Sequence, residues 1–179
     1  LAVMTAIATG VAVEQVLVAV AHAAEHQLRG ARVTVHLLDD AMQLLDAGEQ
    51  AGGDDSAEER VMPLRLGLHP AFEAVLSRRT IVVDDLGSSP LWQGALASMR
   101  ESGVGAAAFV PIVGRDNGAL GTLVASWPRS RALGARELLT LELSARHAAI
   151  ALDKRRAEES LRESRNRFAQ VFEAMVEGC

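Results

Sequence analysis

The feature that most constrains the fold is the run from Ala135 to Glu177, which contains neither glycine nor proline. Because these two residues most often interrupt a helix, the run predicts one long helix. Apolar residues recur along its first half at steps of three and four, as in the seam of a two-stranded coiled coil. The predicted dimer seam consists of Leu138, Leu141, Ala145, Ala148 and Leu152. We therefore expect two copies of the chain to associate through this helix.

The length and composition set the kind of core that can form. A chain of 179 residues has room for one domain with a sizeable core and a helical extension. Apolar residues make up 49% of the chain, but aromatic residues only 3%, and tyrosine is absent. The core must therefore consist mainly of alanine, valine and leucine, which favours helices packed closely over a sheet.

Charge and cysteine content exclude several classes of partner. The formal charge of -5 and the pI near 5.5 provide no basic surface for nucleic acid. A single cysteine, Cys179, excludes an internal disulfide and a cysteine-based metal cluster. Residues 1–13 are uncharged but lack a basic leader, and Glu14 and His22 interrupt any longer apolar run. We expect a cytoplasmic chain without a membrane partner, and a fragment of a longer protein.

The first half of the chain has the pattern of a helix followed by a hairpin. A buried stripe at helical spacing predicts a helix over residues 13–28, closed by Gly30. Residues 32–38 alternate in character and predict a strand, which Asp39 and Asp40 turn into a second strand over 42–46. The alternation places His36 on the face opposite Val33 and Val35. Residues 47–59 are polar and predict a loop.

The second half predicts two short helices and three further strands. His69 and Pro70 open a helix over 71–78, and a β-branched strand follows at 80–83. A helix is expected at about 91–101. The stretches 106–113 and 119–127 form a hairpin through an Asn-Gly turn. Pro111, inside the first of these two strands, predicts a sheet edge or a bulge.

Several stretches, taken together, resemble GAF domains of bacterial signalling proteins. They are VTVHLLD at 33–39, TIVVDDLGSSPLW at 80–92, the strand pair at 103–121 with VPIVGRDNGALG, and the stretch at 137–156 that runs through AAIALDKRR. The resemblance implies an α+β fold over residues 1–153, an antiparallel sheet flanked by helices with long N- and C-terminal helices. ESLRESRNRFAQVFE at 159–173 resembles the lead-in helix of a PAS domain. Residues 154–179 are then a helical linker and the truncated start of a PAS-like domain.

The resemblance also implies a function. GAF domains carry a ligand pocket on the sheet, and the terminal helices relay binding to an output domain such as a histidine kinase or a cyclic-di-GMP enzyme. We expect a homodimer through the terminal helices, with PAS and output domains downstream. The ligand would be an unidentified small molecule. The candidate ligand-binding residues are His36, His69, Leu91, Trp92, Met99, Phe109 and Pro111.

The remaining alternatives concern chemistry. No Ser/His/Asp order, nucleophile elbow or phosphate loop is present, so the chain is not expected to be an enzyme. The histidines and acidic doublets lack metal-ligand spacing, and no metal site or required cofactor is expected. The residue set of cyclic-nucleotide-binding GAF domains and the bilin-attaching cysteine are also missing. A ligand-free dimerisation scaffold, and a haem sensor that uses His36 or His69, stay open.

Overall fold

Within the described residues the sheet has five strands, and every neighbouring pair is antiparallel. The computed structural model describes residues 5, 11–38, 44–46, 69–88, 99, 101 and 103–177, and the side chains of these residues up to Phe168, except in β2. The strands are β1 (Arg32–Leu38), β2 (Leu44–Asp46), β3 (Ile81–Val83), β4 (Ala106–Val113) and β5 (Ala119–Trp127). Their order across the sheet is β2-β1-β5-β4-β3. The hairpin β4–β5 thus occupies the centre, with the N-terminal hairpin on one side.

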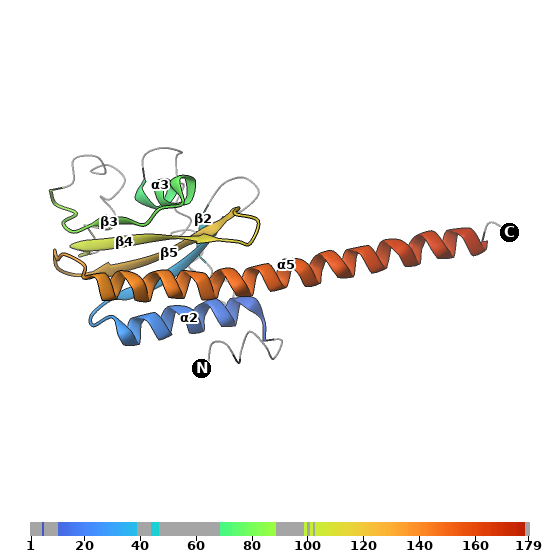
Figure 1. The fold of residues 1–179 in the computed structure, drawn as a ribbon, viewed down its shortest axis with the longest axis horizontal. Helices are drawn as coiled ribbons and strands as arrows, with labels where there is room; N and C mark the ends of the chain where they lie inside the picture. The colour runs from blue at the N-terminus through green and yellow to red at the C-terminus, as the bar shows by residue number, and fades with distance from the viewer. Residues whose placement is uncertain are drawn as a thin grey trace.

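Helices cover both faces of this sheet. The helices are α2 (Val13–Gln27), α3 (Pro70–Ser77) and α5 (Ala135–Glu177). The short helix α3 lies on one face, whereas α2 and the first part of α5 lie side by side on the other (Figure 1). The rest of α5 extends past the end of the sheet (Figure 1). The observed architecture is the α+β arrangement that the sequence predicts.

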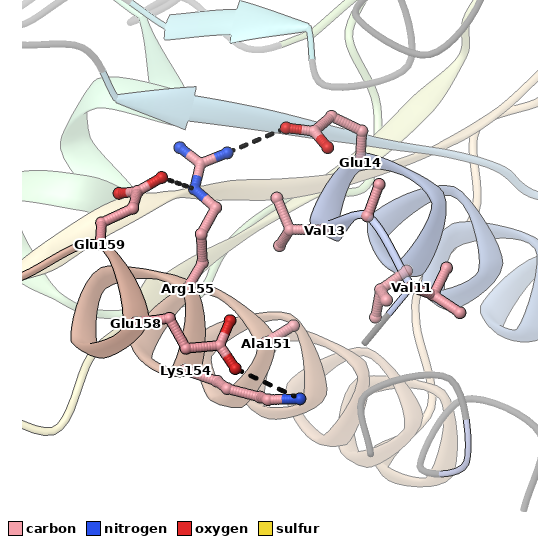
Figure 2. Close-up of a pocket in the computed structure, with 10 residues that line it drawn as sticks. Val11, Val13, Glu14, Ala151, Lys154, Arg155, Glu158 and Glu159 are labelled. Atoms are coloured by element: carbon pink, nitrogen blue, oxygen red, sulfur yellow. Dashed lines mark hydrogen bonds and ion pairs between the residues drawn. The ribbon is translucent and has the colours of Figure 1, made fainter. Parts of the chain in front are cut away.

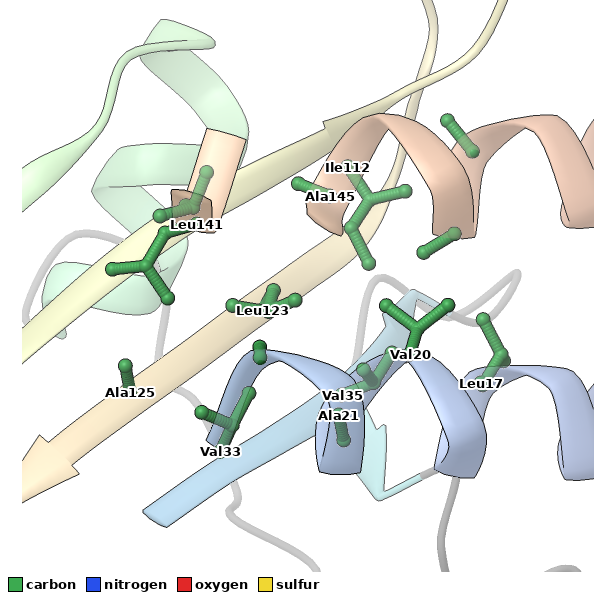
Figure 3. Close-up of a cluster of buried hydrophobic side chains, with 14 of the residues drawn as sticks. Leu17, Val20, Ala21, Val33, Val35, Ile112, Leu123, Ala125, Leu141 and Ala145 are labelled. Atoms are coloured by element: carbon green, nitrogen blue, oxygen red, sulfur yellow. The ribbon is translucent and has the colours of Figure 1, made fainter. Parts of the chain in front are cut away.

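Each face of the sheet has a hydrophobic core of its own. The large core lies between the sheet and the pair α2 and α5 (Figure 3). It includes Leu17, Val20, Ala21, Val33, Val35, Ile112, Leu123, Ala125, Trp127, Leu141, Ala145, Ala148 and Leu152. The small core lies under α3. It consists of Ala71, Phe72, Ala74, Val75, Val83, Leu86, Ala107, Phe109 and Val124.

The apolar stripe of α5 has a different role from the one predicted. Leu141, Ala145, Ala148 and Leu152 are buried in the large core of their own chain, and Leu138 is half-buried. A stripe at steps of three and four is the same whether a helix packs on its own sheet or on a second copy. These residues therefore cannot form an exposed dimer seam. Any seam must use another face of α5.

Most strand predictions are confirmed, and Pro111 shows why one strand edge stays unpaired. The bounds of β1, β4 and β5 are those expected, and the described part of β2 lies within the range expected for it. Strand β3 pairs with β4 only as far as Phe109, so Pro111 lies beyond the paired part of that edge. A register irregularity follows at Ile112. The predicted loop at 47–59 and most of the helix expected at 91–101 lie outside the described residues.

The described helices also bear on membrane association. None of the helices in the described part of the chain combines the length and the hydropathy that crossing a bilayer requires.

Candidate functional site

His36 lies on the face of the sheet that α3 covers. Its neighbours Val33 and Val35 point into the large core, so the alternation of β1 turns His36 to the opposite side, as predicted. The side chain is 9% exposed, and its Nε2 lies 3.0 Å from the hydroxyl oxygen of Thr34. Its register partner on β5 is Thr122, which is fully buried and donates a hydrogen bond to a backbone carbonyl. Strands β1 and β5 thus place an imidazole and threonine hydroxyls within an otherwise apolar layer.

The close approach of β1 and β5 at this point depends on a glycine. A Cβ at Gly121 would collide with the backbone oxygen of His36. No movement of a flexible side chain could relieve that contact, because the atom belongs to the backbone of the neighbouring strand. Gly121 therefore helps to fix the position of His36 over the small core.

His69 begins α3 and is buried under it. Its Nδ1 accepts a hydrogen bond of 3.1 Å from the amide of Ala71, so the imidazole caps the helix. Pro70 at the first helical position supplies the fixed φ that helices start with. The side chain is 4% exposed, and its ring meets that of Phe109 edge to face at a centroid distance of 5.6 Å. Sequence reasoning placed His69 near a helix cap, but burial could not be foreseen.

The environment of His69 keeps the imidazole uncharged near neutral pH. Burial removes water from the ring and lowers the pKa of His69 from 6.5 to about 4, and the nearby imidazole of His36 contributes in the same direction. The other ring nitrogen, Nε2, is also buried, and it has no hydrogen-bond partner among the described residues. A buried polar atom without a partner needs a physical explanation.

The other predicted site residues fall into three groups. Phe109 is fully buried in the small core, and the half-buried Met99 packs against it. Pro111 points to the same face as Phe109 but lines a separate hollow of about 410 Å³ at the strand edge, beside Arg78 and Arg146. Leu91 and Trp92 lie outside the described residues. The described site is therefore His36, His69 and Phe109, with Met99 at its margin.

A group of contacts that the sequence analysis missed connects the end of β3 to the end of β5. The amide of Arg131 donates to the backbone oxygen of Asp84 at 2.8 Å. The hydroxyl of Ser130 donates to Oδ1 of Asp85 at 2.9 Å. Asp84 and Asp85 lie between Val83 and Leu86, which belong to the small core. We call the contacts of Asp84, Asp85, Ser130 and Arg131 the junction.

The junction continues into the first turn of α5. Nη2 of Arg131 donates to both carboxylate oxygens of Glu137, at 2.7 and 2.8 Å. The guanidinium carbon also lies 5.2 Å from the centroid of the buried Trp127 ring. Glu137 in turn accepts from the amide of Gly134 at 3.0 Å, which is half of a capping box. A glycine three residues before a glutamate at a helix start was the available signal for this cap.

A groove lies on the other side of the molecule, where α5 leaves the body (Figure 2). Nη1 of Arg155 lies 2.9 Å from Oε1 of Glu14 and its Nε lies 3.2 Å from Oε1 of Glu159. Lys154 pairs with Glu158 at 3.7 Å. The groove has a volume of about 330 Å³. The charged side chains that line the groove are already paired with one another. These ion pairs connect α2 to α5, and they leave no charged group for an ionic ligand among the residues drawn in Figure 2.

Within the described part of the chain, no cluster of three histidine, cysteine or acidic residues has the geometry to hold a metal ion. The described residues of the site beneath α3 supply two imidazoles, two threonine hydroxyls and apolar side chains.

The comparisons with known proteins agree with the observed fold. The family model of the GAF domain matches residues 11–153. A GAF domain from a phosphoenolpyruvate-protein phosphotransferase of Coxiella burnetii is 17% identical, with a TM-score of 0.68, over 88% of this chain and 92% of that one. No curated protein matches by sequence comparison.

Two further solved structures have the same fold. Residues 122 to 287 of a methyl-accepting chemotaxis protein are 22% identical, with a TM-score of 0.65, over 85% of this chain and 95% of that one. A GAF domain/HD domain protein from Geobacter sulfurreducens is 19% identical, with a TM-score of 0.63, over 79% and 92%.

Proposed function

Because the chain belongs to the GAF domain family, we propose that it is a sensory module of a multidomain bacterial signalling protein. In this proposal a small molecule binds beneath α3, and the helix α5 transmits the binding event. The chain itself is regulatory and not catalytic. The chemotaxis and phosphotransferase proteins whose domains share its fold support this class of function.

The observation that carries the proposal is the junction. The site lies on one face of the sheet and α5 on the other, so a signal must cross from one face to the other. Asp84 and Asp85 follow Val83 of the small core directly, and they hydrogen-bond to Ser130 and Arg131. Arg131 then holds Glu137 in the first turn of α5. A shift of the small core on ligand binding would therefore strain the start of α5.

A stripe of exposed apolar side chains along α5 supports a dimer. This charged helix extends past the body, and helices in proteins owe most of their stability to the packing of an amphipathic face rather than to the isolated helix. Exposed apolar side chains nevertheless follow one stripe along it: Leu143 is 45% exposed, Leu161 56% and Phe168 75%. The half-buried His147 and Ile150 fall on the same stripe at steps of three and four, and Ile150 also packs against the margin of the large core. We propose that this stripe, and not the residues of the large core, meets a second copy.

The regions downstream complete the proposal. Residues 154–179 would form the linker into a PAS-like domain, followed by an output domain such as a histidine kinase or a cyclic-di-GMP enzyme. A parallel pair of α5 helices would then deliver the same displacement to both output domains.

The experiment is native mass spectrometry of the gently purified chain. The expected result is a dimer with the additional mass of a retained small molecule. An apo monomer would contradict both parts of the proposal. An apo dimer would favour a ligand-free scaffold, for which the full burial of Phe72 and Phe109 is the favourable observation.

A matched pair of variants tests the dimer stripe. Leu161→Asn removes an apolar side chain from the stripe, and Glu163→Asn places the same residue on the opposite face of the helix. We expect Leu161→Asn to raise the dimer dissociation constant about tenfold, which corresponds to ~1.4 kcal/mol. Glu163→Asn should change it little. Equal effects of the two variants would exclude this stripe as the seam.

A further inference from the structure

We propose that the site beneath α3 takes an uncharged, largely apolar molecule that accepts a hydrogen bond from Nε2–H of His69, and that His69 does not bind haem or a metal ion. The inference rests on the proposed function, because it names the chemistry of the ligand at the same site. The observation behind it is the hydrogen bond from the amide of Ala71 to Nδ1 of His69, which determines which ring nitrogen carries the hydrogen.

The backbone determines which nitrogen of His69 carries the hydrogen. The amide of Ala71 can only donate, so Nδ1 of His69 must present a lone pair to it. A protonated imidazole carries hydrogen on both nitrogens and could not cap the helix. The neutral ring must then carry its single hydrogen on Nε2. The structure of the cap thus makes Nε2 a donor.

This arrangement is the reverse of a metal-binding histidine. Metal coordination through Nε2 needs a lone pair there and moves the hydrogen to Nδ1, which usually donates to an acceptor. In this chain Nδ1 faces the amide N–H of Ala71, so two donors would point at each other. Haem ligation by His69, an alternative in the sequence analysis, would therefore cost the cap of α3.

Among the described residues, no charged side chain is buried with this donor. Nε2 of His69 is buried and has no acceptor among the described residues. The buried polar side chains of the described chain are His36, His69, Thr122 and Ser144, none of which is a carboxylate, lysine or arginine. A charged ligand would lose its hydration and find no buried counter-charge in the described part of the chain. An acceptor on an uncharged molecule, such as a carbonyl, satisfies the donor at no such cost.

The first test determines which ring nitrogen of His69 carries the hydrogen. Long-range ¹H–¹⁵N correlation spectra of the ¹⁵N-labelled chain separate a histidine with hydrogen on Nε2 from one with hydrogen on Nδ1. We expect the Nε2–H form for His69 at neutral pH, unchanged when haemin or Zn²⁺ is added. A hydrogen on Nδ1, or loss of the Nε2–H signal on addition of haemin, would overturn the inference.

The second test uses three probes of similar size: acetophenone with a carbonyl acceptor, ethylbenzene with none, and benzoate with a charge. We expect acetophenone to bind about tenfold more tightly than ethylbenzene, as one additional hydrogen bond allows, and benzoate to bind most weakly. His69→Ser keeps a good N-cap but removes the donor, so it should abolish the preference for acetophenone. The fold of this variant is checked by circular dichroism.

The outcomes separate the inference from the proposed function. If wild-type protein binds acetophenone and ethylbenzene equally, Nε2–H is directed at the ring of Phe109, and the inference fails while a ligand site remains. If His69→Ser keeps the preference, the donor is another group and the inference fails as well. If none of the three probes binds, the proposed ligand site fails and takes the inference with it.

Discussion

The two faces of the sheet differ in what they bury. Under α2 and α5 the large core consists of hydrophobic residues, with Trp127 as the bulkiest, and its indole Nε1 is the one side-chain polar atom there that is buried without a hydrogen-bond partner among the described residues of that core. Under α3 the layer is smaller and includes His36, His69 and Thr122 beside two phenylalanines. An apolar layer gains stability from every group it removes from water, whereas buried polar groups cost free energy unless they find partners. The face under α2 and α5 therefore contributes more to the stability of the fold, and the face under α3 retains buried polar side chains at a cost in stability.

The largest effect should come from the large core. Leu141→Ala removes a fully buried side chain between α5 and the sheet, and should lower the free energy of unfolding by about 3 kcal/mol. Leu139→Ala, on the same helix but 55% exposed, is the matched control and should stay within about 0.5 kcal/mol. Urea denaturation measures both. A similar cost for the two variants would mean that α5 is not anchored by this face.

Because the small core buries His69, the free energy of unfolding should depend on pH. His69 has a folded pKa of about 4, below the 6.5 of the unfolded chain. Between these values the unfolded chain binds more protons, so the stability that a neutral His69 supports is full above 6.5 and falls as pH drops toward 4. From about pH 7.5 to about pH 5 the loss should be on the order of 2 kcal/mol.

His69→Asn provides the control for this pH dependence. Asparagine is a good N-cap and does not titrate, so the variant should keep α3 but lose the part of the pH dependence that comes from His69. The carboxylates of the chain contribute equally to both proteins and cancel in the difference. If both proteins lose stability in parallel as the pH falls, His69 is not buried as the structure places it.

The two faces also differ in how well the sequence predicts them. The alternation of β1 places His36 correctly, and helical spacing identifies the buried stripe of α2, because local periodicity determines which side chains share a face. The same periodicity cannot say what a face packs against. For that reason the spacing predicts that Leu141 and Leu152 meet a second copy, whereas in the structure they pack on their own sheet.

The parts of the site that the sequence could not provide depend on contacts between distant segments. The burial of His69 needs Phe109, which lies forty positions further along the chain, to close over the ring. The junction needs Asp85 and Ser130 to meet across the sheet. An aspartate doublet after a strand is also an ordinary turn signal. No local pattern therefore distinguishes aspartates that only form a turn from aspartates that also bond to a distant segment.

The smallest effect concerns the junction, where the two faces are connected. Glu137→Gln removes the charge that Arg131 holds but keeps an oxygen for the amide of Gly134. Because the pair is partly exposed, the free energy of unfolding should fall by only about 0.5 to 1 kcal/mol. Glu158→Gln, which weakens the more exposed pair with Lys154, should cost about 0 to 0.5 kcal/mol.

The informative measurement for Glu137→Gln is the effect of ligand binding beneath α3 on the first turns of α5, rather than the free energy of unfolding. If the junction joins the faces, amide hydrogen exchange in the first turns of α5 should slow when acetophenone binds to the wild-type chain. Glu137→Gln should reduce this response, and Glu158→Gln should preserve it. A response of equal size in both variants would mean that binding reaches α5 through the sheet itself. The two faces would then be coupled by packing across β4 and β5, and the contacts of Arg131 would only hold the start of the helix.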